Sequence, residues 1–301
     1  MNSRPKIMVT GANGQLGKEL KEISPLYPQF DFIFLSREDL PIHHFELVRN
    51  FFETVEPDYC INCAAYTAVD KAELEKELAF QVNGEAVGVL AAVCKEHDSK
   101  LIHLSTDYVF DGRATTPYTE NFPPHPINVY GASKLEGEKQ ALQLNPGCII
   151  IRTSWLYSSF GKNFVKTMMR LMNERNEVGV VNDQVGSPTY AADLAETILK
   201  IISDFSSKNF QDRNSDLTPG IYHFSNEGVI SWYEFALAIK EMTVSHCVVK
   251  PLTTAEYPTD TRRPAYTALD NSKIKNTFGI RQKNWKESLA VCIEKIKKQR
   301  P

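Results

Sequence analysis

Tyr130 and Lys134 have a spacing that could support acid–base chemistry. Of the 12 tyrosines in the chain, only Tyr130 has a lysine four positions later. On a helix this spacing puts both side chains on one face. An ammonium beside a phenol stabilises the phenolate and lowers the pKa of the phenol from about 10, so the tyrosine can exchange a proton near neutral pH. The alternative is a surface tyrosine beside a solvated lysine, because chance alone produces one such pair among so many tyrosines.

Hydroxyl and amide side chains upstream could complete such a site. The apolar run 101–106, LIHLST, ends at Ser105 and Thr106. If this run is a parallel strand, its carboxyl end lies near the ligand, and a hydroxyl there could bind a substrate carbonyl beside the phenol. Asn83 has a low propensity for its position in the middle of a helical stretch. It suggests either a contact to backbone or water, or an ordinary exposed asparagine.

A glycine-rich loop near the start of the chain could bind phosphate. Gly11, Gly14 and Gly17 surround Gln15 and Leu16 between an apolar strand and a helix. Glycines permit a tight turn and let backbone amides approach a pyrophosphate at the helix N-terminus. The spacing is G-x-x-G-x-x-G instead of G-x-G-x-x-G. This loop favours nucleotide binding over a plain strand–helix turn.

The end of the second apolar strand indicates which dinucleotide would bind. The strand ends Leu35-Ser36-Arg37, without a carboxylate before Glu38. A free ribose 2′-hydroxyl usually meets Asp or Glu, whereas a 2′-phosphate prefers arginine, which binds it bidentately. Ser36 and Arg37 therefore favour NADPH, with NADH left open. The alternative for Arg37 is a solvated loop side chain.

Alternating strands and helices must position these residues. The strands are almost continuously apolar, which is typical of a parallel sheet covered on both faces. We expect an α/β fold, a Rossmann-type doubly wound parallel sheet with a smaller α/β substrate-binding lobe. The expected strands are 6–10, 30–36, 59–65, 101–106, 148–157 and 221–226, with a strand and turn over 178–190. The expected helices are 11–23, 45–55, 77–97, 128–142, 163–175, 192–205, 231–242 and 285–300.

The rhythm of the chain changes after Trp155, which suggests two lobes. Residues 1–155 with about 189–228 form the expected NADP-binding domain. Residues about 156–188 with 229–301 form the expected nucleotide-sugar-binding lobe, placed over the carboxyl edge of the sheet. A polar stretch at 206–220 reads as an exposed loop.

Composition limits the classes of protein to consider. The net charge of -3, from 34 basic and 37 acidic residues, disfavours a nucleic-acid partner, which needs a basic surface. No apolar run approaches the roughly 20 residues of a membrane span, and the start of the chain does not resemble a secretory signal. We therefore expect no membrane partner, a cytoplasmic protein and six reduced cysteines. Cys60 and Cys63 share a C-x-x-C spacing inside an apparent strand, whose opposite faces exclude a shared metal.

Several long motifs in order resemble the short-chain dehydrogenase/reductase superfamily, in its extended branch that acts on nucleotide sugars. Within that branch the chain is similar to the family of dTDP-4-dehydrorhamnose reductases. The similar segments are NCAAYTAVDKAE (62–73), STDYVFDG (105–112), NVYGASKLEGE (128–138), RTSWLY (152–157), NFVKTM (163–168), NDQVGSPT (182–189) and RRPAYTALD (262–270).

The resemblance implies a role for each matching residue. Tyr130 would be the catalytic acid, Lys134 would tune it and hold the nicotinamide ribose, and Thr106 would bind the reacting oxygen. The remaining residues would bind the cofactor, NADPH, or the nucleotide-sugar substrate. The implied cofactor residues are Gly11, Gly14, Gln15, Leu16, Gly17, Ala65, Tyr66 and Thr67, and the implied substrate residues are Thr106, Asp107, Trp155 and Arg263.

Departures from the family and its relatives leave alternatives open. Pro41 stands where the family often has a cofactor-contacting Asp, and it lacks both the carboxylate and the backbone donor. Some relatives use Mg²⁺ at a dimer interface, so a homodimer and Mg²⁺ stay open although no metal ligands are assigned. Tyr108 follows Asp107 where sugar dehydratases have a carboxylate. The alternatives to a dehydrorhamnose reductase are another nucleotide-sugar reductase, an epimerase, or a non-catalytic subunit like the regulatory subunit of methionine adenosyltransferase.

Overall fold

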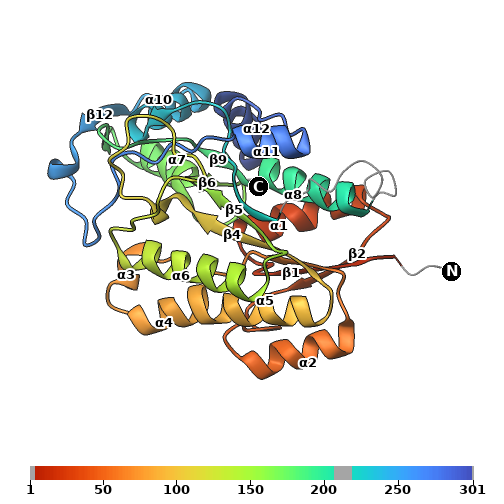
Figure 1. Cartoon of the computed structure of the whole chain (residues 1–301). Helices are drawn as coiled ribbons and strands as arrows, with labels where there is room; N and C mark the ends of the chain where they lie inside the picture. Colours follow the sequence, from red (N-terminus) through yellow and green to blue (C-terminus); the bar gives the residue numbers. More distant parts are fainter. Residues whose placement is uncertain (1–3, 207–218, 300–301) are drawn as a thin grey trace.

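The structure is a computed structural model that describes residues 4–206 and 219–299. Its centre is a six-stranded parallel sheet in the order β10-β5-β4-β3-β1-β2 (Figure 1). The order reverses between β1 and β3, because β2 lies on the outer side of β1. The strands are β1 (Lys6–Thr10), β2 (Asp31–Leu35), β3 (Tyr59–Asn62), β4 (Lys100–Thr106), β5 (Ile149–Thr153) and β10 (Gly220–His223).

Alternate residues of each strand pack on opposite faces of the sheet. Ile7 and Val9 join one hydrophobic cluster and Met8 joins another, as expected for side chains of period two. The first cluster lies under α1 (Gln15–Ile23), α8 (Ala191–Ser206) and α11 (Ser272–Phe278). The second lies under α2 (Phe45–Val55), α5 (Ala86–Glu96) and α6 (Val129–Leu144). Figure 1 shows these two layers above and below the sheet. The α/β, doubly wound fold expected from the sequence is confirmed.

A third hydrophobic cluster lies apart from the main sheet. It packs α7, α10 and α12 around the parallel pair of β7 and β12. Short strands connect this region to the rest of the chain. The elements are β6 (Leu156–Tyr157), α7 (Phe164–Glu174), β7 (Glu177–Val181), β8 (Val185–Gly186), β9 (Thr189–Tyr190), β11 (Ile230–Ser231), α10 (Trp232–Thr243), β12 (Val248–Leu252) and α12 (Trp285–Lys298).

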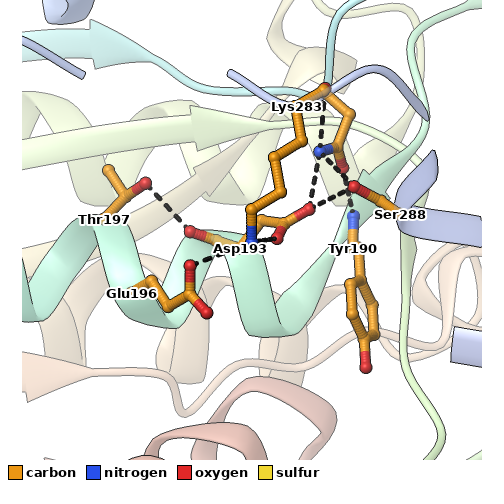
Figure 2. Close-up of polar contacts among 7 residues, drawn as sticks. Tyr190, Asp193, Glu196, Thr197, Lys283 and Ser288 are labelled. Atoms are coloured by element: carbon orange, nitrogen blue, oxygen red, sulfur yellow. Dashed lines mark hydrogen bonds and ion pairs between the residues drawn. The ribbon is translucent and has the colours of Figure 1, made fainter. Parts of the chain in front are cut away.

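Buried hydrogen bonds fasten the C-terminal segment to α8 (Figure 2). The Asp193 carboxylate accepts from Lys283 Nζ at 2.8 Å, from Ser288 Oγ at 2.5 Å and from Asn226 Nδ2 at 2.7 Å. Asn226 Oδ1 also accepts from the backbone N–H of Tyr190 at 2.7 Å. Because Asp193 is only 6% exposed, these donors are what make its burial tolerable.

A long apolar helix runs from Lys76 to Glu96, against the expectation that no such segment exists. With 21 residues and a mean hydropathy of 1.2, it is the one described helix whose length and composition would suit a membrane span. It consists of α4 (Lys76–Phe80), a π-helical turn (Gln81–Glu85) and α5. More than half of it is buried, and α5 packs against α6 and β4. Packing inside the protein accounts for its apolar character.

Other sequence-based boundaries need correction. β3 ends at Asn62, so Cys63 lies beyond the strand, and all six cysteines are free. The expected strand 148–157 breaks after Thr153, because Trp155 adopts a left-handed φ of 47°. β12 and α11 were not expected. Most of the loop expected at 206–220 lies outside the described residues.

Candidate active site

A cavity of about 970 Å³ opens at the carboxyl ends of the sheet strands. Its walls come from the segments that follow β1, β2, β3, β4 and β5, together with α6 and the third hydrophobic cluster. This is where ligands bind in open α/β sheets, beside the reversal of strand order. The sequence-predicted residues that line it are Gly11, Gly14, Gln15, Leu16, Gly17, Arg37, Ala65, Tyr66, Thr67, Thr106, Asp107, Tyr130, Lys134, Trp155 and Arg263.

The glycine loop has the geometry of an anion-binding turn. Gly11 has a φ of +63°, and a Cβ there would lie 2.7 Å from the backbone nitrogen of Ala64. A Cβ on Gly17 would lie 2.6 Å from the carbonyl oxygen of Gly11. Gly14 caps α1 without a side-chain hydrogen bond, which leaves first-turn amides available to a ligand. The loop therefore fits a dinucleotide pyrophosphate.

The far end of the cavity is lined by residues that follow β2. Arg37 is exposed there, and Leu40, Pro41, Ile42 and His43 complete the wall. Pro41 therefore stands at the cavity despite its lack of a donor. Ser36 does not line the cavity: its Oγ donates to Glu38 Oε2 at 2.9 Å, and its N–H donates to Asp39 Oδ2 at 2.8 Å.

Asn83 fixes the loop that follows β3. Its Oδ1 accepts from the backbone N–H of Tyr66 at 2.8 Å, and its Nδ2 donates to the carbonyl of Tyr66 at 3.0 Å. Nδ2 also donates to Ser133 Oγ on α6 at 3.0 Å. The expectation that Asn83 contacts backbone is confirmed. The π-helical turn brings this amide to the Ala65–Thr67 wall of the cavity.

Tyr130 and Lys134 both lie on α6 and line the cavity, but the expectation that Lys134 lowers the pKa of Tyr130 is wrong. The pKa of Tyr130 is raised, because burial disfavours the phenolate and Asp107 adds to this. Thr106, beside the phenol, acts in the opposite direction. Lys134 is not among the groups that shift the pKa of Tyr130, and its Nζ donates to the carbonyl of Leu104 at 2.6 Å.

Lys134 itself has an unusual environment. It is 2% exposed, and burial lowers its pKa to about 8. Besides Leu104, its Nζ lies 3.3 Å from His103 Nε2. An amine whose pKa is near neutral can gain or lose a proton at the operating pH.

Asp107 is 2% exposed and close enough to Tyr130 to raise the pKa of that phenol. Burial raises its pKa to about 7, against hydrogen bonds from Thr106 and Thr267 that lower it. Thr106 Oγ1 donates to Oδ1 at 3.0 Å. Oδ2 and the Thr267 hydroxyl are both buried, and neither has a hydrogen bond of normal geometry. Such an unsatisfied oxygen can accept from a ligand hydroxyl.

The opposite wall is aromatic and basic. Trp155 and Trp232 stack with ring centroids 3.5 Å apart and an interplanar angle of 7°. Arg263 binds both carboxylate oxygens of Asp70 at 2.9 and 3.0 Å. The expected nucleotide-sugar residues Trp155 and Arg263 therefore face the cavity together with Trp232, and Asp70 holds the Arg263 guanidinium from outside the lining.

Trp232, His103 and Asp70 are residues that sequence reasoning did not select. Asp70 lies inside the motif at 62–73, and this was the signal that could have found it. Trp232 has only its aromatic character as a signal, and His103 looks like any residue of a buried strand. In the described residues no group of three or more His, Cys, Asp or Glu side chains gathers as metal ligands.

Comparisons with known proteins agree with this geometry. The family model described as the RmlD substrate binding domain matches residues 5–298. A dTDP-4-dehydrorhamnose reductase from Aggregatibacter actinomycetemcomitans is 41% identical over 290 residues, which cover 94% of this chain and 97% of that protein.

Two crystal structures are also similar over nearly the whole chain. A dTDP-4-dehydrorhamnose reductase from Clostridium acetobutylicum is 41% identical, with a TM-score of 0.90 and coverage of 97% of this chain and 99% of that chain. The reductase of the same name from Bacillus anthracis, in complex with NADP, is 39% identical, with a TM-score of 0.89 and the same coverage.

Proposed function

Because this chain belongs to the RmlD family of dTDP-4-dehydrorhamnose reductases, we propose that it reduces the C4 ketone of dTDP-4-dehydro-6-deoxy-L-mannose to dTDP-L-rhamnose with NADPH. It is an NAD(P)H-dependent oxidoreductase of nucleotide-sugar metabolism. The observation that carries the proposal is a single cavity shared by the glycine loop and the Thr106, Tyr130 and Lys134 side chains.

The cofactor residues have separate tasks in this proposal. Amides of the Gly11–Gly17 loop bind the pyrophosphate, and the wall at Ala65, Tyr66 and Thr67 supports the rest of the dinucleotide. Arg37 binds the 2′-phosphate, and Ser36, which does not line the cavity, would reach that phosphate only by giving up its hydrogen bond to Glu38. When bound, NADPH supplies the hydride that reduces the ketone carbon.

Tyr130 supplies the proton in this reaction. Its raised pKa keeps the phenol protonated, which is the form that a general acid needs before reduction. Its hydroxyl protonates the substrate oxygen as negative charge develops there. Thr106 turns its hydroxyl from Asp107 to the same oxygen and stabilises that charge. Lys134 holds the nicotinamide ribose and tunes Tyr130 once the site is filled.

The sugar nucleotide occupies the other side of the cavity. Asp107 Oδ2 accepts a hydrogen bond from a sugar hydroxyl, which gives this buried oxygen the partner that it lacks within the protein. Trp155 packs against the sugar nucleotide beside Trp232. Arg263 attracts the diphosphate, and Asp70 holds the guanidinium in place. A protein of net charge -3 thereby attracts two anions through local groups.

The lobe boundaries complete the proposal. Residues 1–155 with about 189–228 bind the cofactor, and about 156–188 with 229–301 bind the nucleotide sugar. The separate hydrophobic cluster of α7, α10 and α12 supports this division. We also propose a cytoplasmic enzyme, with NADH as a weaker cofactor and with a homodimer and Mg²⁺ left to experiment.

The decisive experiment is NADPH oxidation with dTDP-4-dehydro-6-deoxy-L-mannose, followed by identification of the product. We expect stoichiometric dTDP-L-rhamnose. Absence of turnover by the folded protein contradicts the proposal and favours a non-catalytic subunit. Purification with firmly bound NAD, and interconversion of sugar epimers without net oxidation of NADPH, indicate an epimerase.

A further inference from the structure

A buried chain of polar side chains crosses the sheet and ends at Lys134. Thr10 on β1 donates from Oγ1 to Asn62 Oδ1 on β3 at 2.6 Å. Asn62 Nδ2 lies 3.0 Å from His103 Nδ1 on β4, and His103 Nε2 lies 3.3 Å from Lys134 Nζ. Asn62 and His103 are paired in the parallel register of β3 and β4. All four residues are at most 2% exposed.

The donors and acceptors along this chain fix the state of the imidazole. Asn62 Oδ1 accepts from Thr10 Oγ1 and from the backbone N–H of Ala64 at 3.2 Å. This orientation turns the Asn62 amide nitrogen, which can only donate, toward His103 Nδ1. Nδ1 must therefore accept. A neutral imidazole then carries its proton on Nε2, and Nε2–H faces Lys134 Nζ.

That proton position selects one form of the lysine. An N–H that points at Nζ is accepted by an uncharged amine and repelled by an ammonium, which has donors only. The amine can still donate to the carbonyl of Leu104. We propose that His103 is a positioning residue that stabilises the uncharged amine of Lys134, through the hydrogen-bond chain that begins at Thr10 and passes through the Asn62 amide.

Other charged or titratable groups around Lys134 do not explain this preference. Glu138, one turn along α6, acts in the opposite direction on the pKa of Lys134, as does Cys63 beyond β3. Glu138 is bound to Arg152 at 2.6 Å. Tyr130, the remaining titratable neighbour on α6, is a neutral phenol. The hydrogen-bond chain thus adds to burial in disfavouring the ammonium, and it keeps a proton acceptor beside the expected proton donor.

The test is a direct titration of Lys134 in ligand-free protein, by NMR of ¹³Cε-labelled lysine assigned with Lys134→Arg. In His103→Gln the amide can present its carbonyl oxygen to the ammonium, so we expect the midpoint of Lys134 to rise by about one pH unit, a tenfold change in its proton affinity. Thr10→Val keeps the shape of the side chain but frees the Asn62 amide to turn. We expect a smaller rise there.

His223→Gln is the matched control, because His223 is equally buried on the same sheet but contacts Arg152 instead of Lys134. We expect no change in the Lys134 midpoint. Unchanged midpoints in His103→Gln and Thr10→Val overturn the proposal, as does an equal rise in His223→Gln. If His103→Gln does not fold, Thr10→Val decides.

A second readout uses the reaction and therefore rests on the proposed function. The alkaline limb of the kcat/KM profile should move with the Lys134 midpoint in both variants, while the KM for the nucleotide sugar changes little. If the protein has no reductase activity this readout is lost, but the NMR titration still decides the role of His103.

Discussion

Tyr130 is held as a protonated phenol, because burial and the nearby Asp107 both disfavour the phenolate. Burial lowers the pKa of Lys134, because it removes solvent from the ammonium. The two pKa values move in opposite directions, but both shifts favour the uncharged form, as desolvation does for any ionisable group. With a pKa of about 8, Lys134 is still mostly an ammonium at pH 7, whereas the raised pKa of Tyr130 keeps it a neutral phenol there.

Tyr130→Phe removes the proposed proton donor while keeping the ring. We expect turnover to fall by about 10²–10⁴-fold, the usual contribution of a general acid, with an unchanged Kd for NADPH measured by fluorescence. Tyr157→Phe is the control, because Tyr157 does not line the cavity and its buried hydroxyl has no hydrogen-bond partner to lose. Near-normal turnover in Tyr130→Phe means that the proton comes from another group.

Arg37→Ala tests the choice of cofactor. A hydrogen bond to a charged group contributes about 1.5–3 kcal/mol, so the Kd for NADPH should rise by about 10–100-fold. The Kd for NADH, which lacks the phosphate, should not change. Arg170→Ala removes an exposed arginine that pairs with Glu174 on α7 and should affect neither cofactor. An equal rise in the Kd values for NADPH and NADH would contradict the assignment of Arg37 to the 2′-phosphate.

Asp107 makes the stability of the ligand-free protein depend on pH. Its pKa is raised to about 7 by burial, from 3.8, so the folded state holds its proton more tightly than the unfolded state. This contribution to stability is present below pH 4 and is lost as the pH rises to 7. Asp107→Asn cannot ionise, so its melting temperature relative to wild type should increase steadily between pH 4 and 7.5. A difference that stays constant over this range contradicts the assigned environment.

At the scale of elements, an irregular turn in one helix builds a wall of the cavity. The turn is the π-helical stretch Gln81–Glu85. Asn83 lies within it, is completely buried and makes three hydrogen bonds. π-Helical turns are frequent at functional sites. In this helix the π-helical turn carries the amide that binds the Tyr66 backbone and so holds the loop after β3.

Asn83→Ala should loosen this wall. The N–H and carbonyl of Tyr66 would lose their partners, at a cost of about 1–3 kcal/mol for each group that stays buried. We expect a lower melting temperature and a weaker Kd for NADPH. Glu85→Ala changes an exposed residue of the same turn and should alter neither property. Unchanged cofactor binding in a destabilised Asn83→Ala protein limits the role of Asn83 to stability.

At the scale of the whole molecule, the cavity lies where separately packed regions meet. The main sheet supplies the strand ends, and the cluster of α7, α10 and α12 supplies the Trp232 wall. Asp193 and its partners bind the C-terminal segment to α8 across this boundary (Figure 2). A ligand that touches both regions should stabilise their assembly.

Saturation with NADPH should therefore raise the melting temperature. At a concentration 100 times the Kd, ligand binding adds about 2.7 kcal/mol to the apparent stability of the folded state. Tyr130→Phe should show the same increase, because the proposal leaves its cofactor site intact. Absence of a shift at saturating NADPH contradicts the assigned cofactor. Addition of EDTA or Mg²⁺ to the same assay shows whether a divalent cation contributes.

Much of the molecule follows from local sequence patterns. Apolar strands followed by amphipathic helices predicted the sheet, and the glycines at 11, 14 and 17 predicted the anion-binding turn. Spacing placed Tyr130 and Lys134 on one helix face. The break at Trp155 was missed, because nothing in the apolar run 148–157 signals a left-handed residue. The π-helical turn was missed for the same reason, although Asn83 itself was a visible irregularity.

The sequence by itself determined most of the elements, their order and the residue types available for chemistry, because backbone conformation and apolar periodicity are local properties. Tertiary structure alone decided the state of those residues. His103 and Lys134, Asp70 and Arg263, and Trp155 and Trp232 meet only in the folded chain. Their desolvation and hydrogen bonding come from segments distant in sequence, and these determine which side chains carry charge. That is why the spacing of Tyr130 and Lys134 predicted a shared face but not the direction of the Tyr130 pKa.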